Sequence, residues 1–260
     1  MSNHGEGVLV GWATADLTPE QPVLLAGQFH ARVSEGVLDP VTATALALES
    51  VGGRVVLVSC DLVAISDSLR HAVRAQLRDL VPELEPADVV LNATHTHTAP
   101  EIRGDLDGRQ LGGGTVGIWP GVDLPAMAPG AYVAVASRRI AEAVAQAWRH
   151  RAPGGMGYGL GQAVVGHNRR ISYDTGETRM YGKTDDPDFR NVEGYEDHSV
   201  NLLFTYDRDS QLTGVVVNLA CPSQVSEHLF EISADFWHET RQELRKRLGA
   251  GVQVLGQASA

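Results

Sequence analysis

Two histidines stand two positions apart in the polar segment 94–98, which reads Thr-His-Thr-His-Thr. The segment follows the short apolar run 88–93, whose length and composition are typical of a β-strand. On an extended backbone, residues i and i+2 point to the same side, so His95 and His97 can face one metal ion, or one can bind it while the other supports it. Neutral imidazole is the commonest metal ligand among side chains. Two solvated histidines in a polar turn would give the same pattern, and the spacing alone leaves both interpretations open.

A second group of candidate metal ligands follows a later predicted strand. It comprises Cys221, Glu227, His228, Asp235, His238 and Glu239. Thiolate, imidazole and carboxylate are the ligand types that zinc prefers. Asp235 and His238 stand at positions i and i+3, so they share a face of a helix if the helix begins that early. A simpler interpretation has Asp235 capping the helix, His238 in solvent and Cys221 buried, and without other support the residues favour it.

Two irregular segments carry further candidates for a site. Residues 166–170 read Gly-His-Asn-Arg-Arg and follow another predicted strand. The two arginines can bind a carboxylate or an oxyanion through paired N–H donors, although a solvated polar loop has the same composition. Residues 99–130 hold many Gly and Pro with little periodicity, which predicts a long loop that carries function or lies over a site.

Hydrophobic periodicity predicts the elements that position these groups. Strands are expected at 8–17, 41–48, 54–60, 88–93, 156–165, 199–206 and 211–220, with a last one starting at 252. Helices are expected at 66–81, 132–149 and 234–248, the first of them capped by Ser66. The run 54–60 is apolar on both faces, which predicts a central strand. Because strands and helices are mixed without a clear linker, residues 1–260 are predicted to form a single α/β domain with a mixed β-sheet core flanked by helices.

The composition narrows the classes of partner. Only 21 Lys and Arg stand against 32 Asp and Glu, and this net charge of −11 argues against a nucleic-acid partner. No apolar run approaches the roughly 18 residues of a membrane span, which predicts no transmembrane segment. The N-terminal residues lack the basic and apolar stretches of a secretory signal, so we expect a soluble, cytoplasmic protein. The two cysteines, Cys60 and Cys221, show no spacing that calls for a disulfide.

Six segments occur in the order found in the neutral/alkaline ceramidase family, and each resembles a motif of that family. Residues 11–19 resemble G-x-A-x-x-D-I-T-P, residues 38–49 resemble D-P-L-x-A-R-A-L-V-L-E, and residues 58–62 match V-S-x-D-L. Residues 92–100 are close to S-A-T-H-T-H-S-G-P, residues 166–170 to G-x-N-R-R, and residues 232–235 to I-S-A-D. Each match is weak alone, but their number and order make the resemblance specific.

The resemblance implies a hydrolase that carries one zinc ion and cleaves the N-acyl amide bond of ceramide or of a related small-molecule or lipid substrate. It implies that His95 is a zinc ligand, that His97 lies beside the metal and the substrate, and that Asn168 and Arg169 belong to the site. Zinc would polarise water or a carbonyl, while cationic donors hold the developing oxyanion. Many members of the family are secreted, in contrast to the location expected from the N-terminus.

The sequence departs from the family pattern at two places. Pro222 stands where the family usually has its second zinc histidine, and Cys221, His228, His238 and Asp235 are the candidates to replace it. If none of them does, the metal is bound more weakly, is a different metal, or is absent. Residues 256–260 resemble the lead-in to the motif that holds the family's active-site serine, so we expect a domain that is incomplete at its C-terminus, with two further zinc ligands of the family beyond it.

Three hypotheses remain at this point. The first is a zinc-dependent amidohydrolase that acts on an N-acyl substrate. The second is a metal-dependent hydrolase of another bond, such as a carboxylic or sulfuric ester, since the ligand types suit it equally well. The third is a non-catalytic binding domain that keeps the fold but has lost the metal, as Pro222 suggests.

Overall fold

The computed structural model describes residues 7–103 and 124–259, so most of the loop predicted at 99–130 lies outside the described residues. The strands are β1 (Val8–Asp16), β2 (Gly36–Val37), β3 (Thr42–Ser50), β4 (Gly53–Cys60), β5 (Val89–Ala93), β6 (Ala152–Gln162), β7 (Arg170–Tyr173), β8 (Thr178–Met180), β9 (Phe189–Val192), β10 (Ser199–Asp207), β11 (Leu212–Leu219), β12 (Glu231–Ile232) and β13 (Gln253–Ala258). The helices are α1 (Asp67–Leu80), α2 (Pro129–Arg149) and α3 (Phe236–Leu248), with a short 3-10 turn at Pro86–Asp88. These elements confirm the predicted α/β class.

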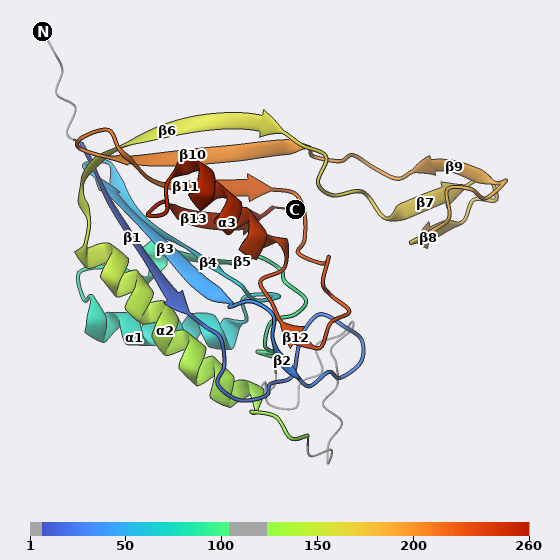
Figure 1. The fold of residues 1–260 in the computed structure, drawn as a ribbon, viewed down its shortest axis with the longest axis horizontal. Coiled ribbons are helices and arrows are strands. Elements are labelled where there is room, and N and C mark those ends of the chain that lie inside the picture. Colours follow the sequence, from blue (N-terminus) through green and yellow to red (C-terminus); the bar gives the residue numbers. More distant parts are fainter. Residues whose placement is uncertain (1–6, 104–123, 260) are drawn as a thin grey trace, which may run out of the picture.

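Eight strands form the main sheet, in the order β13-β11-β10-β6-β1-β3-β4-β5 (Figure 1). Neighbouring strands are antiparallel except for the pairs β4–β5 and β11–β13, which run parallel. β4 lies between β3 and β5, which confirms that the apolar run 54–60 forms an interior strand. Because β4 and β5 are parallel, Cys60 pairs with Ala93, and the residues that follow both strands emerge at the same edge of the sheet.

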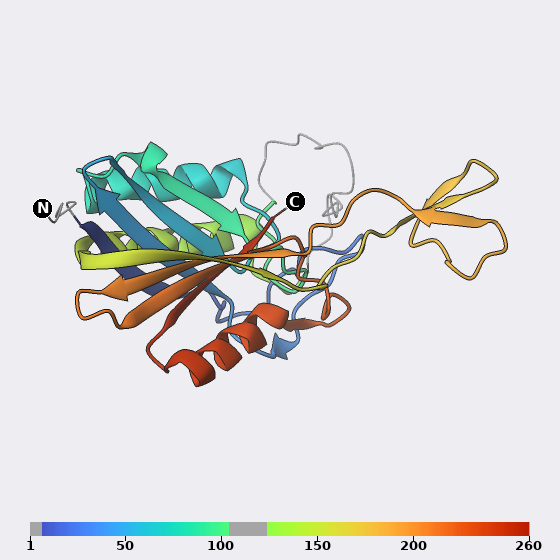
Figure 2. The ribbon, with the colours of Figure 1, turned by 90° about the horizontal axis from the view of Figure 1, so that it is seen from above.

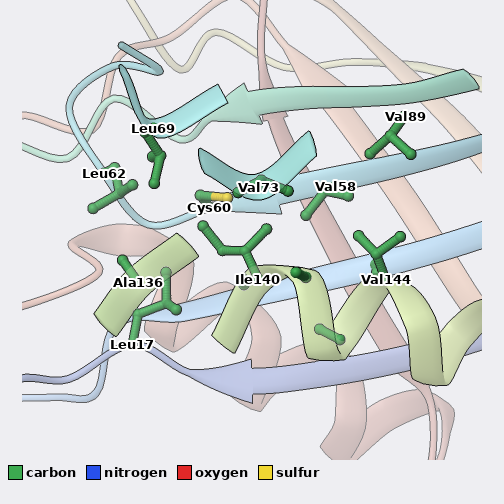
Figure 3. Close-up of a cluster of buried hydrophobic side chains, with 14 of the residues drawn as sticks. Leu17, Val58, Cys60, Leu62, Leu69, Val73, Val89, Ala136, Ile140 and Val144 are labelled. Carbon is green, nitrogen blue, oxygen red and sulfur yellow. The ribbon is translucent and has the colours of Figure 1, made fainter. Parts of the chain in front are cut away.

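Helices α1 and α2 pack on one face of the β1, β3, β4 and β5 part of the sheet (Figure 2) and bury the largest hydrophobic cluster. The Ser66 hydroxyl accepts the N–H of Leu69 at 3.2 Å, which confirms the predicted N-cap of α1. Figure 3 shows Ile140 of α2 facing Cys60 of β4 within this core. In the described part of the chain, no helix is long and apolar enough to span a membrane.

The main sheet is curved, so that residues from both halves of it pack in one buried cluster. Leu255 of β13 and Val216 of β11 lie in one buried cluster with Leu46 of β3 and Val10 of β1. The Ser59 hydroxyl of β4 donates a hydrogen bond to the main-chain carbonyl of Gly256 in β13. On the opposite face of β11 and β13, α3 packs through the fully buried Trp237. The curvature therefore brings the end of β13 close to the ends of β4 and β5.

A separate three-stranded sheet, in the order β8-β7-β9, projects away from the main sheet (Figures 1 and 2). It belongs to residues 163–198, which we call the arm. The sequence predicted that the strand at 156–165 would run three residues into this segment, whereas β6 ends at Gln162. It then predicted a polar loop and no strand at the positions of β7, β8 and β9. Within the three strands only Ile171 and Tyr173 are buried, so the apolar alternation that marks a strand is almost missing from the sequence.

The buried carboxylate of Asp61, directly after β4, joins four elements. Its two oxygens each accept a hydrogen bond of 2.8 Å from the guanidinium of Arg241 in α3. Thr42 of β3 donates its N–H at 2.8 Å and its hydroxyl at 2.9 Å, and Thr94, directly after β5, donates its hydroxyl at 3.1 Å. The Asp61 side chain is 0% exposed and that of Arg241 is 6% exposed. A buried charge is tolerated only when it is paired and hydrogen-bonded in this way.

Replacing Asp61→Asn should lower the free energy of unfolding by about 3–5 kcal/mol, because Arg241 is then left as an uncompensated buried cation. The double variant with Arg241→Met should lose less than the sum of the two single losses, since it removes both charges. Equilibrium unfolding in urea measures all three. Arg247→Met is the matched control, because Arg247 makes a solvent-exposed pair with Glu243 in the same helix and its loss should be small. Additive losses for Asp61 and Arg241 would show that the two charges are not coupled.

Candidate functional site

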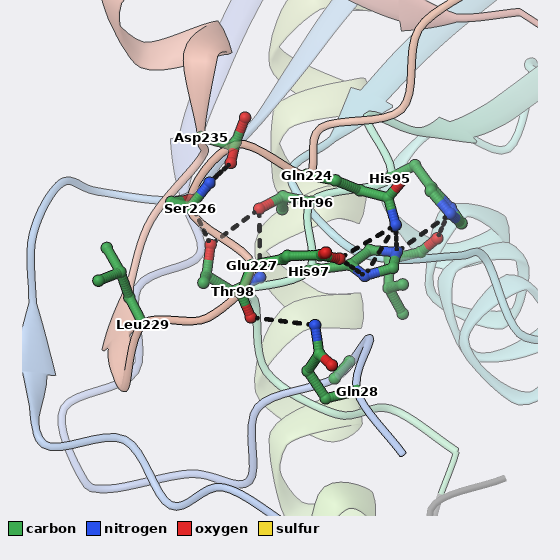
Figure 4. A network of polar contacts seen from close by, with 12 residues as sticks. Gln28, His95, Thr96, His97, Thr98, Gln224, Ser226, Glu227, Leu229 and Asp235 are labelled. Carbon is green, nitrogen blue, oxygen red and sulfur yellow. Dashed lines mark hydrogen bonds and ion pairs between the residues drawn. The ribbon is translucent and has the colours of Figure 1, made fainter. Parts of the chain in front are cut away.

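The histidine segment lies at the sheet edge where β4 and β5 end and where the loop after β11 arrives. The N–H of Thr94 bonds to the carbonyl of Cys60 at 2.9 Å, which continues the pairing of β5 with β4. The hydroxyl of Ser223 donates to the carbonyl of Thr94 at 2.6 Å, and the N–H of His97 bonds to the carbonyl of Ser223 at 3.3 Å. These bonds hold the loop after β11 against the histidine segment, and Figure 4 shows Gln224 and Glu227 of that loop beside His97.

The imidazole rings of His95 and His97 face each other. Their Nε2 atoms are 3.2 Å apart, and the ring centroids are 4.9 Å apart in an edge-on arrangement. The backbone that achieves this is not extended, since His95 has φ of 62°, a strained conformation for a residue with a Cβ. The two rings therefore meet, as the spacing suggested, but a tight turn brings them together instead of a continuing strand.

The acceptors beside each ring indicate which nitrogen carries the proton. His95 Nδ1 lies 2.7 Å from the carbonyl of Val63, which can only accept, so this nitrogen carries the hydrogen and Nε2 has the lone pair. His97 Nδ1 lies 3.1 Å from Oε2 of Glu227, and an ionised carboxylate also only accepts. In the neutral rings, both facing Nε2 atoms therefore present lone pairs. A shared cation between them would relieve this repulsion.

The surroundings of His97 favour its neutral form. The residue is buried, and burial, followed by the neighbouring His95, lowers the pKa of the His97 imidazole below its ordinary value. The backbone of Gly27 packs directly against the ring, and a Cβ at that position would overlap it. Gly27 also has φ of 96°, so this position requires glycine for both reasons. Neutral imidazole is the form that binds a metal ion.

Gln224 connects the histidine pair to the arm. Its amide nitrogen lies 3.2 Å from both ring nitrogens of His97 and 3.2 Å from Oε2 of Glu227. Its amide oxygen accepts a hydrogen bond of 3.2 Å from Arg169, whose guanidinium also donates to the hydroxyl of Tyr181 at 2.6 Å. The structure thus links the predicted residue Arg169 to His97 through Gln224.

The buried guanidinium of Arg32 supports the site through contacts with main-chain carbonyls. Arg32 is 1% exposed, and it donates to the carbonyls of Ala26 at 2.7 Å, His97 at 2.5 Å, Glu227 at 2.7 Å and Leu229 at 2.5 Å. These four carbonyls belong to three segments that are far apart in the sequence. Arg32 therefore fixes the main chain of His97 and of Glu227 relative to each other, and the sequence offered no signal for this role.

Asn168 stands at the base of the arm and makes local contacts. Its amide nitrogen donates to the carbonyl of Glu193, and its amide oxygen accepts the N–H of Arg170 at 3.0 Å. Its own N–H bonds to a carboxylate oxygen of Glu196 at 2.6 Å. The side chain that the resemblance placed in the site is thus bonded at both ends of its amide to the arm.

Asp235 and His238, two further candidate ligands, lie away from the histidine pair. Asp235 caps α3, which begins two residues later than predicted, and its other oxygen accepts the N–H and the hydroxyl of Ser226, both at 2.6 Å. Figure 4 shows this carboxylate bonded to Ser226 and apart from the rings of His95 and His97. His238 lies 3.9 Å from a carboxylate oxygen of Asp39, and both line a separate cavity of about 390 Å³.

Cys221 and His228 do not join the pair either. The thiol of Cys221 lies 3.4 Å from the carbonyl of Pro222, and burial raises the pKa of this thiol, whereas a zinc ligand is a thiolate. His228 is exposed. Within residues 7–103 and 124–259, no three side chains of His, Cys, Asp and Glu are grouped so as to hold a metal ion.

The separation of the two facing nitrogen atoms nevertheless matches that of two zinc ligands. Nitrogen ligands about 2.0–2.1 Å from one tetrahedral zinc ion lie about 3.3 Å apart, and the Nε2 atoms of His95 and His97 are 3.2 Å apart. The protons on both Nδ1 atoms are held by acceptors, as is usual for metal-binding histidines. The donor set therefore fits two of the ligands that a zinc ion needs.

Comparison with known proteins identifies the architecture. No family model matches the sequence, and no characterised protein sequence matches it at a significant level. Two solved structures are similar, a neutral ceramidase from Pseudomonas aeruginosa and a ceramidase complexed with C2, each with a TM-score of 0.70 and 18% identity over 96% of this chain. The chain has a ceramidase-like fold. It spans 38% and 37% of the lengths of those two proteins.

In this ceramidase-like fold, Arg32→Met should lower the free energy of unfolding by about 3 kcal/mol or more, because the carbonyls of Ala26, His97 and Leu229 lose this donor and that of Glu227 keeps only Gln28. Arg32→Lys should fall between the wild type and Arg32→Met, since a single ammonium cannot bridge three segments. Urea unfolding measures the losses. Arg208→Met, at an exposed turn, is the control and should change little. If Arg32→Met and Arg208→Met unfold at the same urea concentration, Arg32 does not stabilise these segments.

Proposed function

We propose that this chain forms the histidine-bearing part of a zinc-dependent hydrolase of the ceramidase type, which cleaves an N-acyl amide bond. The observation that carries the proposal is the facing pair of His95 and His97, whose Nε2 atoms are 3.2 Å apart. A ceramidase-like fold supports the same reading. The chain covers less than two fifths of the length of the ceramidases it resembles, so the proposal concerns the activity of the whole enzyme to which such a domain contributes.

The residues of this chain have distinct roles in the proposed reaction. His95 and His97 would hold the zinc ion, which when bound polarises a carbonyl or a water molecule. The guanidinium of Arg169 can donate to the oxygen of the scissile carbonyl as negative charge develops there. Tyr181 and Gln224 orient that guanidinium through the hydrogen bonds described above. Glu227, 3.1 Å from His97 Nδ1, would keep the proton of His97 on that nitrogen.

Exposed apolar side chains next to the site support an acylated substrate. Tyr181, which bonds to Arg169, is 68% exposed, and Val225, next to Gln224, is 75% exposed. Phe29 is 88% exposed and follows Gln28, whose amide donates to the carbonyl of Glu227 at 3.3 Å. Covering apolar surface of this kind with an acyl chain removes it from water, which favours binding. The same polar groups would serve a carboxylic ester, so ester cleavage is the second candidate.

The purified protein should retain one zinc ion per chain after dialysis, and His95→Ala should lose it, because that variant removes one of the two facing nitrogens. Elemental analysis by mass spectrometry measures the stoichiometry. His71→Ala is the matched control, since His71 lies exposed on α1, and it should keep the metal.

Hydrolytic activity should require the bound zinc ion. With N-acyl amine, carboxylic ester and sulfate ester substrates in parallel, the enzyme should prefer the amide, and His95→Ala should lower kcat/KM at least about 100-fold, since even groups that only orient a ligand contribute 10–100-fold. Preference for an ester would select the second candidate. Undiminished amide hydrolysis by protein freed of metal would exclude the zinc mechanism, and a wild type that binds no zinc and cleaves none of the substrates would leave the binding-domain hypothesis.

A further inference from the structure

Strand β6 is paired on both sides only at its start. Residues 154–162 pair with β10, whereas on the other side only residues 152–154 pair with β1. Beyond this point β1 and β6 diverge, and Figure 1 shows β6 running along the upper margin of the molecule. Within the described part of the chain, no strand pairs with this side of β6 over residues 155–162. β6 therefore has a free edge about 26 Å long.

The pairing with β10 shows which main-chain groups point to the free edge. The N–H of Ala163, directly after β6, bonds to the carbonyl of His198 at 2.9 Å. In an antiparallel pair, residues that bond to the partner strand alternate with residues whose N–H and carbonyl point to the other side. The odd-numbered residues of β6 therefore bond to β10. The even-numbered residues from 156 to 162 direct their N–H and carbonyl groups outward, where the described residues offer them no partner.

The same even-numbered residues carry exposed apolar side chains. Met156 is 50% exposed, Tyr158 is 70% exposed and Leu160 is 61% exposed. They alternate with glycines, so they lie on one face of the strand. Residues 152–168 contain no Asp, Glu, Lys or Arg, although such residues make up 20% of the chain. Natural proteins usually protect an exposed edge with charge, proline or a bulge, and residues 155–162 have none of these. The edge is therefore suited to pair with another strand.

We propose that the free edge of β6 pairs antiparallel with the same edge of a second copy of this chain, so that two main sheets join into one. Such pairing places even-numbered residues opposite even-numbered ones, for example Met156 opposite Leu160 and Tyr158 opposite its own equivalent. The outward N–H and carbonyl groups of the two copies then meet as hydrogen-bonded pairs. Aromatic and apolar side chains that lie opposite each other across two strands stabilise the pair. The edge is thus complementary to itself.

The charge of the chain favours this place for a contact between copies. With a net charge of −11, two copies repel each other over most of their surfaces, but residues 152–168 bring no acidic or basic side chain into the contact. A lipid surface would cover the apolar side chains and leave the main-chain groups without partners, so a polypeptide strand fits better. Because β6 leads into the arm and the paired strands are antiparallel, the two arms leave the joined sheet at opposite ends.

Sedimentation equilibrium over a range of protein concentrations tests the proposal without substrate or metal. We expect the wild type to dimerise with a dissociation constant on the order of 1–100 μM, because one pair of strands is smaller than a standard interface. Leu160→Pro removes an outward N–H and no bond to β10, a change that an edge strand tolerates. It should raise the dissociation constant at least about tenfold, since two hydrogen bonds are lost per dimer.

Two further variants separate the edge from other surfaces. Leu160→Lys keeps the N–H but brings like charges together across the pair, and it should also raise the dissociation constant at least about tenfold. Val90→Lys is the matched control, because Val90 is 47% exposed on β5, which lies at one end of the main sheet. This control should dimerise as the wild type does. Circular dichroism and urea unfolding check that each variant is folded.

Amide hydrogen exchange locates the contact. The N–H groups of Met156, Tyr158 and Leu160 should exchange more slowly at high protein concentration than after dilution, whereas those of Gly157 and Gly159, which bond to β10, should not change. A wild type that stays monomeric at several times the expected dissociation constant overturns the proposal and leaves the edge to another partner. A dimer that survives both Leu160 variants, with no concentration dependence in the exchange of these amides, overturns it too, because the copies then meet elsewhere.

Discussion

The buried pair of Asp61 and Arg241 is the constraint from which the rest of the site follows. Asp61 leaves β4 at the point where β5 also ends, and it bonds to Thr42, Thr94 and Arg241 together. Thr94 immediately precedes His95, so the position of the first histidine depends on a carboxylate at the end of the neighbouring strand. Arg241 adds α3 to the same point. One buried charge pair thus fixes the ends of two strands, a third strand and a helix relative to each other.

A second buried cation organises the other side of the site. Arg32 has carbonyl groups as partners instead of a carboxylate, so it satisfies main-chain acceptors in loops that have no regular structure. Buried main-chain groups need hydrogen-bond partners. The guanidinium of Arg32 is the shared donor for carbonyls of the loops around His97. The strained φ of His95 is tolerated because hydrogen bonds hold this part of the chain in place. The His95 ring bonds to the carbonyl of Val63, and the preceding residue, Thr94, bonds to Ser223 and to Asp61.

The elements of the fold were predictable where burial is regular. Six strands and all three helices were expected within a few residues of their observed bounds, because each carries an apolar run or stripe in the sequence. The six strands are β1, β3, β4, β5, β10 and β11. The arm was not, since its strands bury only Ile171 and Tyr173. α3 starts at Phe236 and not at 234, because the carboxylate of Asp235 caps the first turn. The closure of the sheet onto β13 had no local signal, since it depends on contacts between Ser59 and Gly256 and among residues of distant strands.

The sequence by itself determined the α/β class, the strand that leads into His95, and the presence of a histidine pair with Arg169 as a companion. Only the tertiary structure decided which other residues stand beside that pair. Gln224, Glu227 and Arg32 reach His97 through hydrogen bonds that span 65 to 130 positions of the chain, and no spacing rule of a helix or strand extends that far. Asp235 and His238 have suitable side chains but face another cavity. Ligand type can be read from the sequence, whereas convergence on one point depends on how the strands and loops pack.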